Sequence, residues 1–152
     1  MAKRVLIIGD STCDLTPEMR EALSVGFMPL PVNVGDEPRK DMENVFPQEI
    51  FDYYKNTGKL CTTSAPNTND YHEFWKPILA ENPDAEIIHF HISSEMTSTY
   101  LASYTASQEY DNVYSIDTRS VSIGVALLIL EACGMRDSGM SAPEIVEAIN
   151  AM

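Results

Sequence analysis

The feature that most constrains the fold is a run of four aliphatic residues near the start of the chain. Val5 to Ile8 contain no polar side chain, and the turn Gly9–Thr12 follows directly. A strand with one face in water alternates apolar and polar residues, whereas a strand covered on both faces is a continuous apolar run. Thr16 is then suited to cap a helix, with Pro17 at its first position. The pattern predicts a buried parallel strand followed by a helix.

The rest of the chain alternates in the same way between predicted strands and helices. Further strands are expected over Phe27–Val34, Glu86–Ile92 and Val113–Asp117, and two prolines mark the first of these as marginal or as an edge strand. Gly35–Asn44 predicts a loop or short edge hairpin, and Leu60–Asn67 predicts a loop. Helices are expected over 17–24, 47–58, 69–79, from the segment 93–99 to about 110, over 121–135, and from the capping box at Ser141 onward. This alternation predicts an α/β domain with a mainly parallel sheet flanked by helices.

The charge composition excludes several classes of partner. The chain has 10 Lys and Arg residues against 23 Asp and Glu residues, a formal net charge of −13. So acidic a surface repels phosphate backbones and anionic lipid head groups, which argues against nucleic-acid and membrane-surface binding. Arg119 and Arg136 are the only basic residues after Lys76. An anionic ligand in this half of the chain therefore depends on neutral donors.

Cysteine usage and the lengths of the apolar segments indicate the compartment. Cys13, Cys61 and Cys133 are widely spaced and form no C-x-x-C pair, which is typical of a reducing environment. The longest wholly aliphatic stretch, Val125 to Leu130, is far shorter than the roughly 20 residues of a membrane helix. Its residues 127–130 are expected in the core rather than along a ligand tunnel. We expect a cytoplasmic single-domain protein without a membrane span.

Hydroxyl-rich turns follow three of the predicted strands, at Gly9–Thr12, Ile92–Ser94 and Ile116–Thr118, and a fourth hydroxyl cluster lies at Thr62–Ser64. In α/β folds ligands bind beyond the carboxyl ends of the strands. The coincidence predicts a concave site lined by neutral donors and backbone N–H groups. The amides and hydroxyls of the helix start at 93–100 suit a carboxylate or phosphate, although plain capping by Thr97 explains that segment equally well.

A hydrolase is the first alternative, because Gly9-Asp10-Ser11 opens one class of serine esterases. That chemistry needs a histidine base late in the chain, and none follows His91. A hydrolase that uses Ser11 is therefore the less favoured interpretation. The simpler one is that Asp10 and Ser11 cap backbone groups at the end of the strand.

The histidine pair offers a second alternative. His89 and His91 alternate within a strand, so both imidazoles face the same side. A metal site would need a third ligand, such as His72 or an acidic residue, and a phosphocarrier role has no supporting motif. Structural histidines with satisfied hydrogen bonds are the favoured interpretation.

Four ordered motifs resemble a known family. They are Asp10-Ser11-Thr12-Cys13-Asp14-Leu15, Thr63-Ser64-Ala65-Pro66, the segment from Ile92 to Tyr100, and Asp117 to Gly124. Together they resemble the DegV family, bacterial fatty-acid-binding proteins that include the lipid-carrying subunits of fatty acid kinase. The chain departs from the family pattern at four positions, Ala65, Asn67, Ser98 and Ala126. Ser98 replaces a glycine and narrows the approach of a ligand head group to the backbone.

The resemblance implies a three-layer α/β/α domain that binds a long-chain fatty acid and catalyses nothing, with no cofactor and no metal. The residues implied to hold the carboxylate are Thr63, Ser94, Ser64 and Ser93, with Asp10, Ser11, Thr97, Asp117 and Ser122 supporting the loops and Phe27, Met28 and Leu30 beside the tail. Neutral donors at a helix N-terminus hold a carboxylate without a buried counter-charge. A separate kinase subunit would receive the bound acid.

The family's chain is roughly twice as long and has two domains. Residues 1–152 therefore resemble the amino-terminal domain alone, with the second domain absent. Such a domain exposes an apolar face, which predicts self-association into a homo-oligomer. A truncated structural or regulatory module without a ligand is the remaining alternative.

Overall fold

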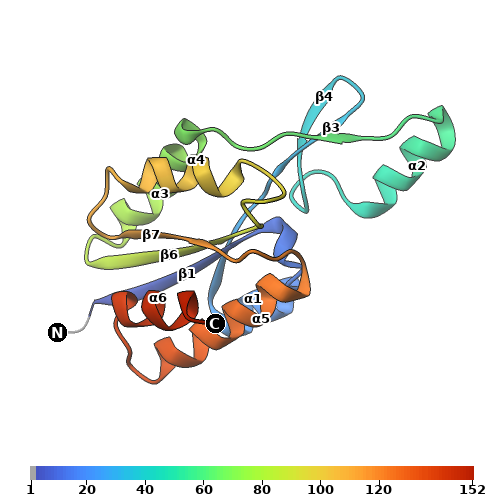
Figure 1. Ribbon diagram of the computed structural model, residues 1–152. Coiled ribbons are helices and arrows are strands. Elements are labelled where there is room, and N and C mark those ends of the chain that lie inside the picture. Colours follow the sequence, from blue (N-terminus) through green and yellow to red (C-terminus); the bar gives the residue numbers. More distant parts are fainter. Residues whose placement is uncertain (1–2) are drawn as a thin grey trace.

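The computed structural model describes residues 3–152, and its centre is a four-stranded sheet with helices on both faces (Figure 1). The strands lie in the order β2-β1-β6-β7, and each neighbouring pair is parallel. Their bounds are β1 (Arg4–Asp10), β2 (Val25–Met28), β6 (Ala85–His91) and β7 (Val113–Asp117). The predicted α/β class with a parallel sheet is confirmed.

The helices form the two outer layers (Figure 1). On one face lie α3 (Thr68–Glu81) and α4 (Thr99–Ser107), and on the other lie α1 (Pro17–Leu23), α5 (Ile123–Asp137) and α6 (Ala142–Asn150). Two predicted helix starts are confirmed. Thr16 accepts a hydrogen bond from the Met19 amide, and Ser141 forms its capping box with Glu144. The architecture is the expected three-layer α/β/α arrangement.

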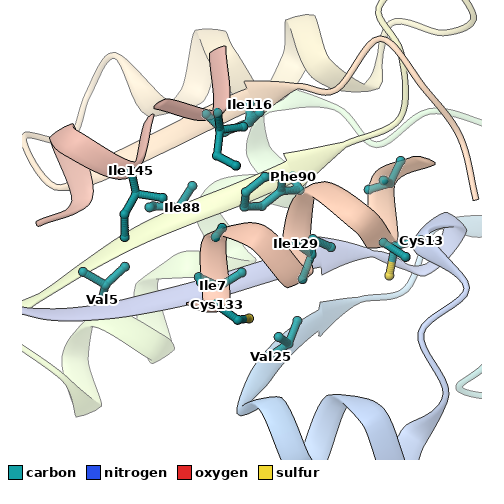
Figure 2. Packing of buried hydrophobic residues seen from close by; sticks show 14 of the residues in the cluster. Val5, Ile7, Cys13, Val25, Ile88, Phe90, Ile116, Ile129, Cys133 and Ile145 are labelled. Atoms are coloured by element: carbon teal, nitrogen blue, oxygen red, sulfur yellow. The ribbon is translucent and has the colours of Figure 1, made fainter. Parts of the chain in front are cut away.

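The central strands are apolar on both faces because both faces are covered. Ile7 of β1 packs toward α5 with Phe90 and Ile129, as Figure 2 shows, whereas Ile8 packs toward α3. Fully burying one such side chain stabilises the fold by about 1.5–3 kcal/mol. Gly9 permits the close approach of α5, because a Cβ there would lie 2.8 Å from Ile129 Cδ1.

The prediction of one strand over Phe27–Val34 is wrong. The segment divides into β2, at the edge of the parallel sheet, and β3 (Pro31–Val34), which pairs antiparallel with β4 (Glu37–Lys40) and β5 (Thr62–Thr63) in a second sheet. Pro29 and Pro31 have no amide hydrogen for a continuous ladder, so the chain changes sheets between them. The hairpin turns at Gly35, whose φ of 64° suits glycine.

Residues 30–65 form an arm that leaves the main body (Figure 1). The arm holds the small sheet β4-β3-β5 and helix α2 (Pro47–Thr57). Within the described chain α2 buries none of its residues, and Phe51 and Tyr54 are 60% and 52% exposed. The predicted loop at Leu60–Asn67 contains β5, which returns the chain from α2 to the body. Apart from the buried side chains of Val32 and Val45, the arm thus contains few buried apolar residues.

Helix α5 corrects another expectation. Ile129 is buried and Leu128 packs on the core, but Leu127 is 58% exposed and Leu130 lies at the surface. Because α5 covers only one face of the sheet, only one side of the helix is buried. Exposed Ile123 lies one turn before Leu127, so an apolar stripe faces outward. Self-association of the chain through an exposed apolar face stays a prediction. None of the helices within residues 3–152 has the length and apolar character needed to cross a membrane.

Candidate functional site

A cavity of about 470 Å³ lies beside the carboxyl ends of β1 and β6, where the arm meets the main body. Thr12, which follows β1, lines it together with Ile92 and the segment 96–99, which follow β6. The arm supplies the facing wall through residues 30–32 and 63–65. The cavity is therefore at the end of the sheet where ligands of parallel α/β folds bind.

Hydroxyl groups from three segments gather in this cavity. Thr63 and Ser64 come from the arm, Thr97 precedes α4, and Thr12 follows β1. The Oγ1 atom of Thr97 lies 2.9 Å from Thr99 Oγ1 and accepts a hydrogen bond from the Thr99 amide. Of the residues that the structure describes along this cavity, none is Lys, Arg or His. The structure brings three predicted residues together here, namely Thr63, Ser64 and Thr97.

Ser94 and Asp117 lie outside the set of residues that line this cavity. The Ser94 hydroxyl donates to Asp117 Oδ2 at 2.5 Å, and the Ser94 amide donates to Asp117 Oδ1 at 3.0 Å. Partial burial would raise the pKa of Asp117, but hydrogen bonds from Ser94 and from the Arg119 amide outweigh it and hold that pKa below its ordinary value. The pair joins the ends of β6 and β7.

Three other predicted serines hold backbone turns. The Ser11 hydroxyl accepts from the Leu30 amide at 3.1 Å, and the Ser93 hydroxyl accepts from the Glu95 amide at 3.2 Å. The Ser122 amide donates to the carbonyl of Thr12 at 2.9 Å, with φ at 58° and ψ at −127°. Ser11 is 4% exposed, and the nearby histidines bond to Asp10 instead. The capping role expected for Ser11 is found, and a nucleophilic role for it has no support in this geometry.

Asp10 does not cap a backbone group, which corrects that expectation. Its carboxylate is fully buried between the two histidines of β6, with Oδ1 at 3.2 Å from His89 Nε2 and Oδ2 at 3.1 Å from His91 Nδ1. The two imidazoles do face the same side of the strand, as predicted. We name Asp10, His89 and His91 the buried cluster.

Helices α3 and α4 complete the surroundings of the buried cluster. The Trp75 indole N–H donates to His89 Nδ1 at 3.0 Å, and the Ser103 hydroxyl lies 2.7 Å from His91 Nε2. Ser103 also lies 2.7 Å from the Ser115 hydroxyl on β7. The buried cluster thus connects β1, β6 and β7 with both helices of one layer.

The proton positions in the buried cluster decide what it can bind. Its three side chains are close enough to share a metal ion. However, an indole N–H only donates, so His89 Nδ1 is the acceptor and the proton of neutral His89 lies on Nε2. Nε2 then faces Asp10 as a donor and has no free lone pair for a metal. This arrangement favours structural histidines, as the sequence suggested. The expectation that their hydrogen bonds are satisfied is wrong for His89 Nε2, because its 3.2 Å contact with Asp10 Oδ1 does not have hydrogen-bond geometry and no other partner lies within residues 3–152.

Burial sets the protonation of this cluster. Burial lowers the pKa of His89 to about 4, so this imidazole is neutral near neutral pH. Burial would raise the pKa of Asp10, but the contacts with His91 and His89 outweigh it and hold that pKa well below its ordinary value. An ionised carboxylate therefore lies in the core between imidazole donors.

The predicted tail residues lie in different places. Leu30 lines the hydroxyl-rich cavity. Met28 lines a separate cavity of about 340 Å³ with Phe74, and Pro31 lines both cavities, so the two are neighbours. Phe27 instead makes a cation–π contact with Arg20, whose Cζ atom lies 3.8 Å from the centre of the Phe27 ring. Leu30 and Met28 therefore lie where an apolar chain could contact them.

Thr12 is a cavity residue that the sequence reasoning did not single out as a ligand. The signal was present, since Thr12 belongs to the same turn as Asp10 and Ser11. Its Oγ1 atom is buried and has no hydrogen-bond partner among residues 3–152.

Comparisons with known proteins agree with the fold and with the motifs. Residues 4–152 match the family model described as uncharacterised protein, DegV family COG1307. A DegV domain-containing protein of Clostridium perfringens is 31% identical over 148 residues, which are 96% of this chain and 52% of that protein. A DegV domain-containing protein of Staphylococcus aureus is 30% identical over 151 residues, covering 99% of this chain and 53% of its own. The chain thus spans about half the length of these relatives.

Solved structures show the same fold. A DegV family protein from Thermus thermophilus, described by its fatty acid binding, has a TM-score of 0.85 and 29% identity, over 97% of this chain and 52% of its own. A Thermotoga maritima protein described as revealing a fatty acid binding function has a TM-score of 0.83 and 27% identity, over 98% of this chain and 55% of its own. Since the family model matches nearly every residue, the chain belongs to the DegV family.

Proposed function

We propose that this chain binds the carboxylate of a long-chain fatty acid in the cavity between the arm and the main body. Thr63 and Ser64 donate to the carboxylate from the arm, and Thr97 lies on the opposite wall. The observation that carries the proposal is this gathering of hydroxyls, without a cationic side chain among the described lining residues. The fatty acids bound by the Thermus and Thermotoga proteins support the choice of ligand.

Neutral donors suit a carboxylate that is partly removed from water. Hydrogen bonds to an ionised acceptor are short and about twice as strong as those between neutral groups. They also avoid the desolvation of a second charge that a buried ion pair requires. In this proposal Ser93 and Ser94 have a smaller part, because the Ser94 hydroxyl must leave Asp117 before it can reach a ligand.

The tail of the acid would follow the apolar part of the same wall. Leu30, Val32 and Met96 line the cavity, and Pro31 continues into the neighbouring cavity beside Met28 and Phe74. Each methylene removed from water contributes about 0.8 kcal/mol. The two cavities together thus offer a path that begins at the hydroxyls and has apolar residues along it, although Lys40, Asp70 and Glu73 also line its second part.

The role of the whole protein is part of the same proposal. We infer that residues 1–152 are the amino-terminal domain of a two-domain carrier that is not an enzyme and acts in the cytoplasm. The carrier would present the acid to a separate kinase subunit, as the resemblance to the lipid-carrying subunits of fatty acid kinase implies.

Two measurements on the purified full-length protein, that is, the proposed two-domain carrier, test this proposal. The first is lipid extraction with mass spectrometry, and the second is calorimetry with oleate after delipidation. A copurifying long-chain acid and saturable oleate binding are expected. Repeated lipid-free preparations that also bind no oleate would favour a module without a ligand. Hydrolysis of p-nitrophenyl esters that is lost in Ser11→Ala would instead favour the hydrolase.

A further inference from the structure

Thr12 has a hydroxyl group that the protein itself leaves unused. The residue lies in the short turn η1 (Ser11–Cys13) after β1 and is one of the residues that line the hydroxyl-rich cavity. Its Oγ1 atom is buried and has no hydrogen-bond partner within residues 3–152. Most buried polar side-chain atoms in proteins have a partner, because an unpaired one has lost its water without replacement. A group that accepts from Thr12 is therefore expected in the cavity.

The backbone around Thr12 is fixed on both sides. The carbonyl of Thr12 accepts from the Ser122 amide at 2.9 Å, and the preceding Ser11 hydroxyl accepts from the Leu30 amide at 3.1 Å. The following Cys13 is 1% exposed in the core beneath α5. These contacts hold the turn in place and leave only the Thr12 hydroxyl without a role.

The surroundings of Thr12 indicate the chemistry of the missing partner. Thr63 and Thr97 line the same cavity from the arm and from the segment before α4. Residues with hydroxyl groups from three separate segments line one space, which suits a ligand with several acceptor lone pairs. A carboxylate has two such oxygens and accepts up to about four hydrogen bonds.

We propose that Thr12 is a further ligand-binding residue, and that its hydroxyl donates to the carboxylate of the bound acid. This inference rests on the proposed function and adds a donor from the end of β1. Because its turn is already rigid without ligand, Thr12 loses little conformational freedom on binding, which favours affinity.

The substitution Thr12→Val tests the proposal, because it keeps the branched shape and removes only the hydroxyl. Oleate affinity should fall by roughly 10- to 150-fold, as expected for one hydrogen bond to a charged acceptor. Thr12→Ser should retain most of the affinity. Thr62→Val is the matched control, since Thr62 precedes Thr63 on β5 and lies outside the residues that line the cavity.

Two further readouts separate a ligand contact from a structural role. The melting temperature of ligand-free Thr12→Val should equal or exceed that of the parent, because the substitution removes an unpaired buried hydroxyl. Thr12→Val should also weaken the binding of oleyl alcohol, which has an uncharged head group. The factor by which it weakens oleyl alcohol binding should be about ten times smaller than the factor for oleate. Both measurements use the full-length protein.

The outcomes distinguish this inference from the proposed function. One outcome is that Thr63→Val weakens oleate binding while the oleate affinity of Thr12→Val stays within twofold of the parent. The role assigned to Thr12 is then wrong, and the assignment of the carboxylate site to this cavity is still supported. A lower melting temperature with unchanged affinity would make Thr12 a structural residue. If the parent itself binds no oleate, the proposed function fails and the assignment of Thr12 fails with it.

Discussion

The buried cluster and the hydroxyl-rich cavity contain residues that are close in sequence, but their polar side chains have different surroundings. Asp10 belongs to the cluster and Thr12 to the cavity, and His91 and Ile92 are divided in the same way. In the cluster, charged and polar groups contact one another inside the core. Around the cavity, residues with hydroxyl groups line a space of about 470 Å³. The comparison teaches that the position of a polar residue along a strand end decides whether it is enclosed among protein partners or lies beside a cavity.

The difference arises from the protein groups that are within reach. Inside the sheet Asp10 meets imidazoles, and an ionised carboxylate is stable in the core only with such donors. Two residues later the chain has left the sheet, and Thr12 lies beside a cavity that residues of the arm also line. A polar side chain there has few protein partners and stays available.

The largest effect is expected from breaking the buried cluster. Asp10→Ala removes the carboxylate that contacts two buried imidazoles and should destabilise the fold by about 3–5 kcal/mol. Urea unfolding measures this change. The matched control is Asp84→Ala, at an exposed aspartate before β6, which should change stability by about 0.5 kcal/mol or less. Equal effects of the two substitutions would contradict the structural role of Asp10.

Acid should weaken the same cluster. The pKa of His89 falls from 6.5 to about 4 on folding, so between these values the unfolded chain binds a proton that the folded chain does not. Stability should therefore decrease as the pH falls from 6.5 to 4, by about 1.4 kcal/mol per pH unit from this group. The lowered pKa of Asp10 acts in the same direction at still lower pH. In His89→Gln this contribution should be absent, and an unchanged pH dependence would refute it.

In the cavity the expected effect is on binding rather than on folding. Thr63→Val should weaken oleate binding by about 1.5–3 kcal/mol, since it removes a donor to a charged group. Ser94→Ala should weaken it less, because that hydroxyl already bonds to Asp117. Calorimetry on the full-length protein compares both with Thr62→Val. If oleate affinity falls more in Ser94→Ala than in Thr63→Val, the carboxylate site would instead be assigned to the turn after β6.

The smallest effect concerns Asp41, an acidic residue on the wall of the cavity. Its negative charge opposes that of a bound carboxylate, by about 1 kcal/mol at 4 Å in water. Asp41→Asn should therefore strengthen oleate binding by roughly two- to fivefold at low salt, and less at high salt. Titrations at two ionic strengths check this expectation, and weaker binding would show that Asp41 supports the site.

Local patterns in the sequence were enough to predict most of the main body. The aliphatic run from Val5 to Ile8 predicts a strand covered on both faces, and the caps at Thr16 and Ser141 place two helix starts correctly. These features depend on residues close together in the chain, so the sequence contains their signal directly. The change of sheet near Pro29 was missed, because strand pairing depends on partners far away in sequence.

The candidate site was predictable in composition but less so in geometry. The hydroxyl turns lie at the ends of the expected strands, and Thr63, Ser64 and Thr97 share one cavity. The pairing of Ser94 with Asp117, and of Asp10 with two histidines, depends on the distances between neighbouring strands. Those distances are fixed only when the strand order and register are known.

The two walls of the cavity belong to different parts of the fold, the main body and the arm. Thr12 and Thr97 lie on the main body, whereas Thr63 and Ser64 lie on the arm. The arm joins the body near Pro29 and Pro66, outside the parallel sheet. A change in the position of the arm would therefore alter the distance between the two sets of hydroxyl-bearing residues and leave the parallel sheet intact. In the proposed site that distance would set how many hydroxyls can reach one carboxylate at the same time.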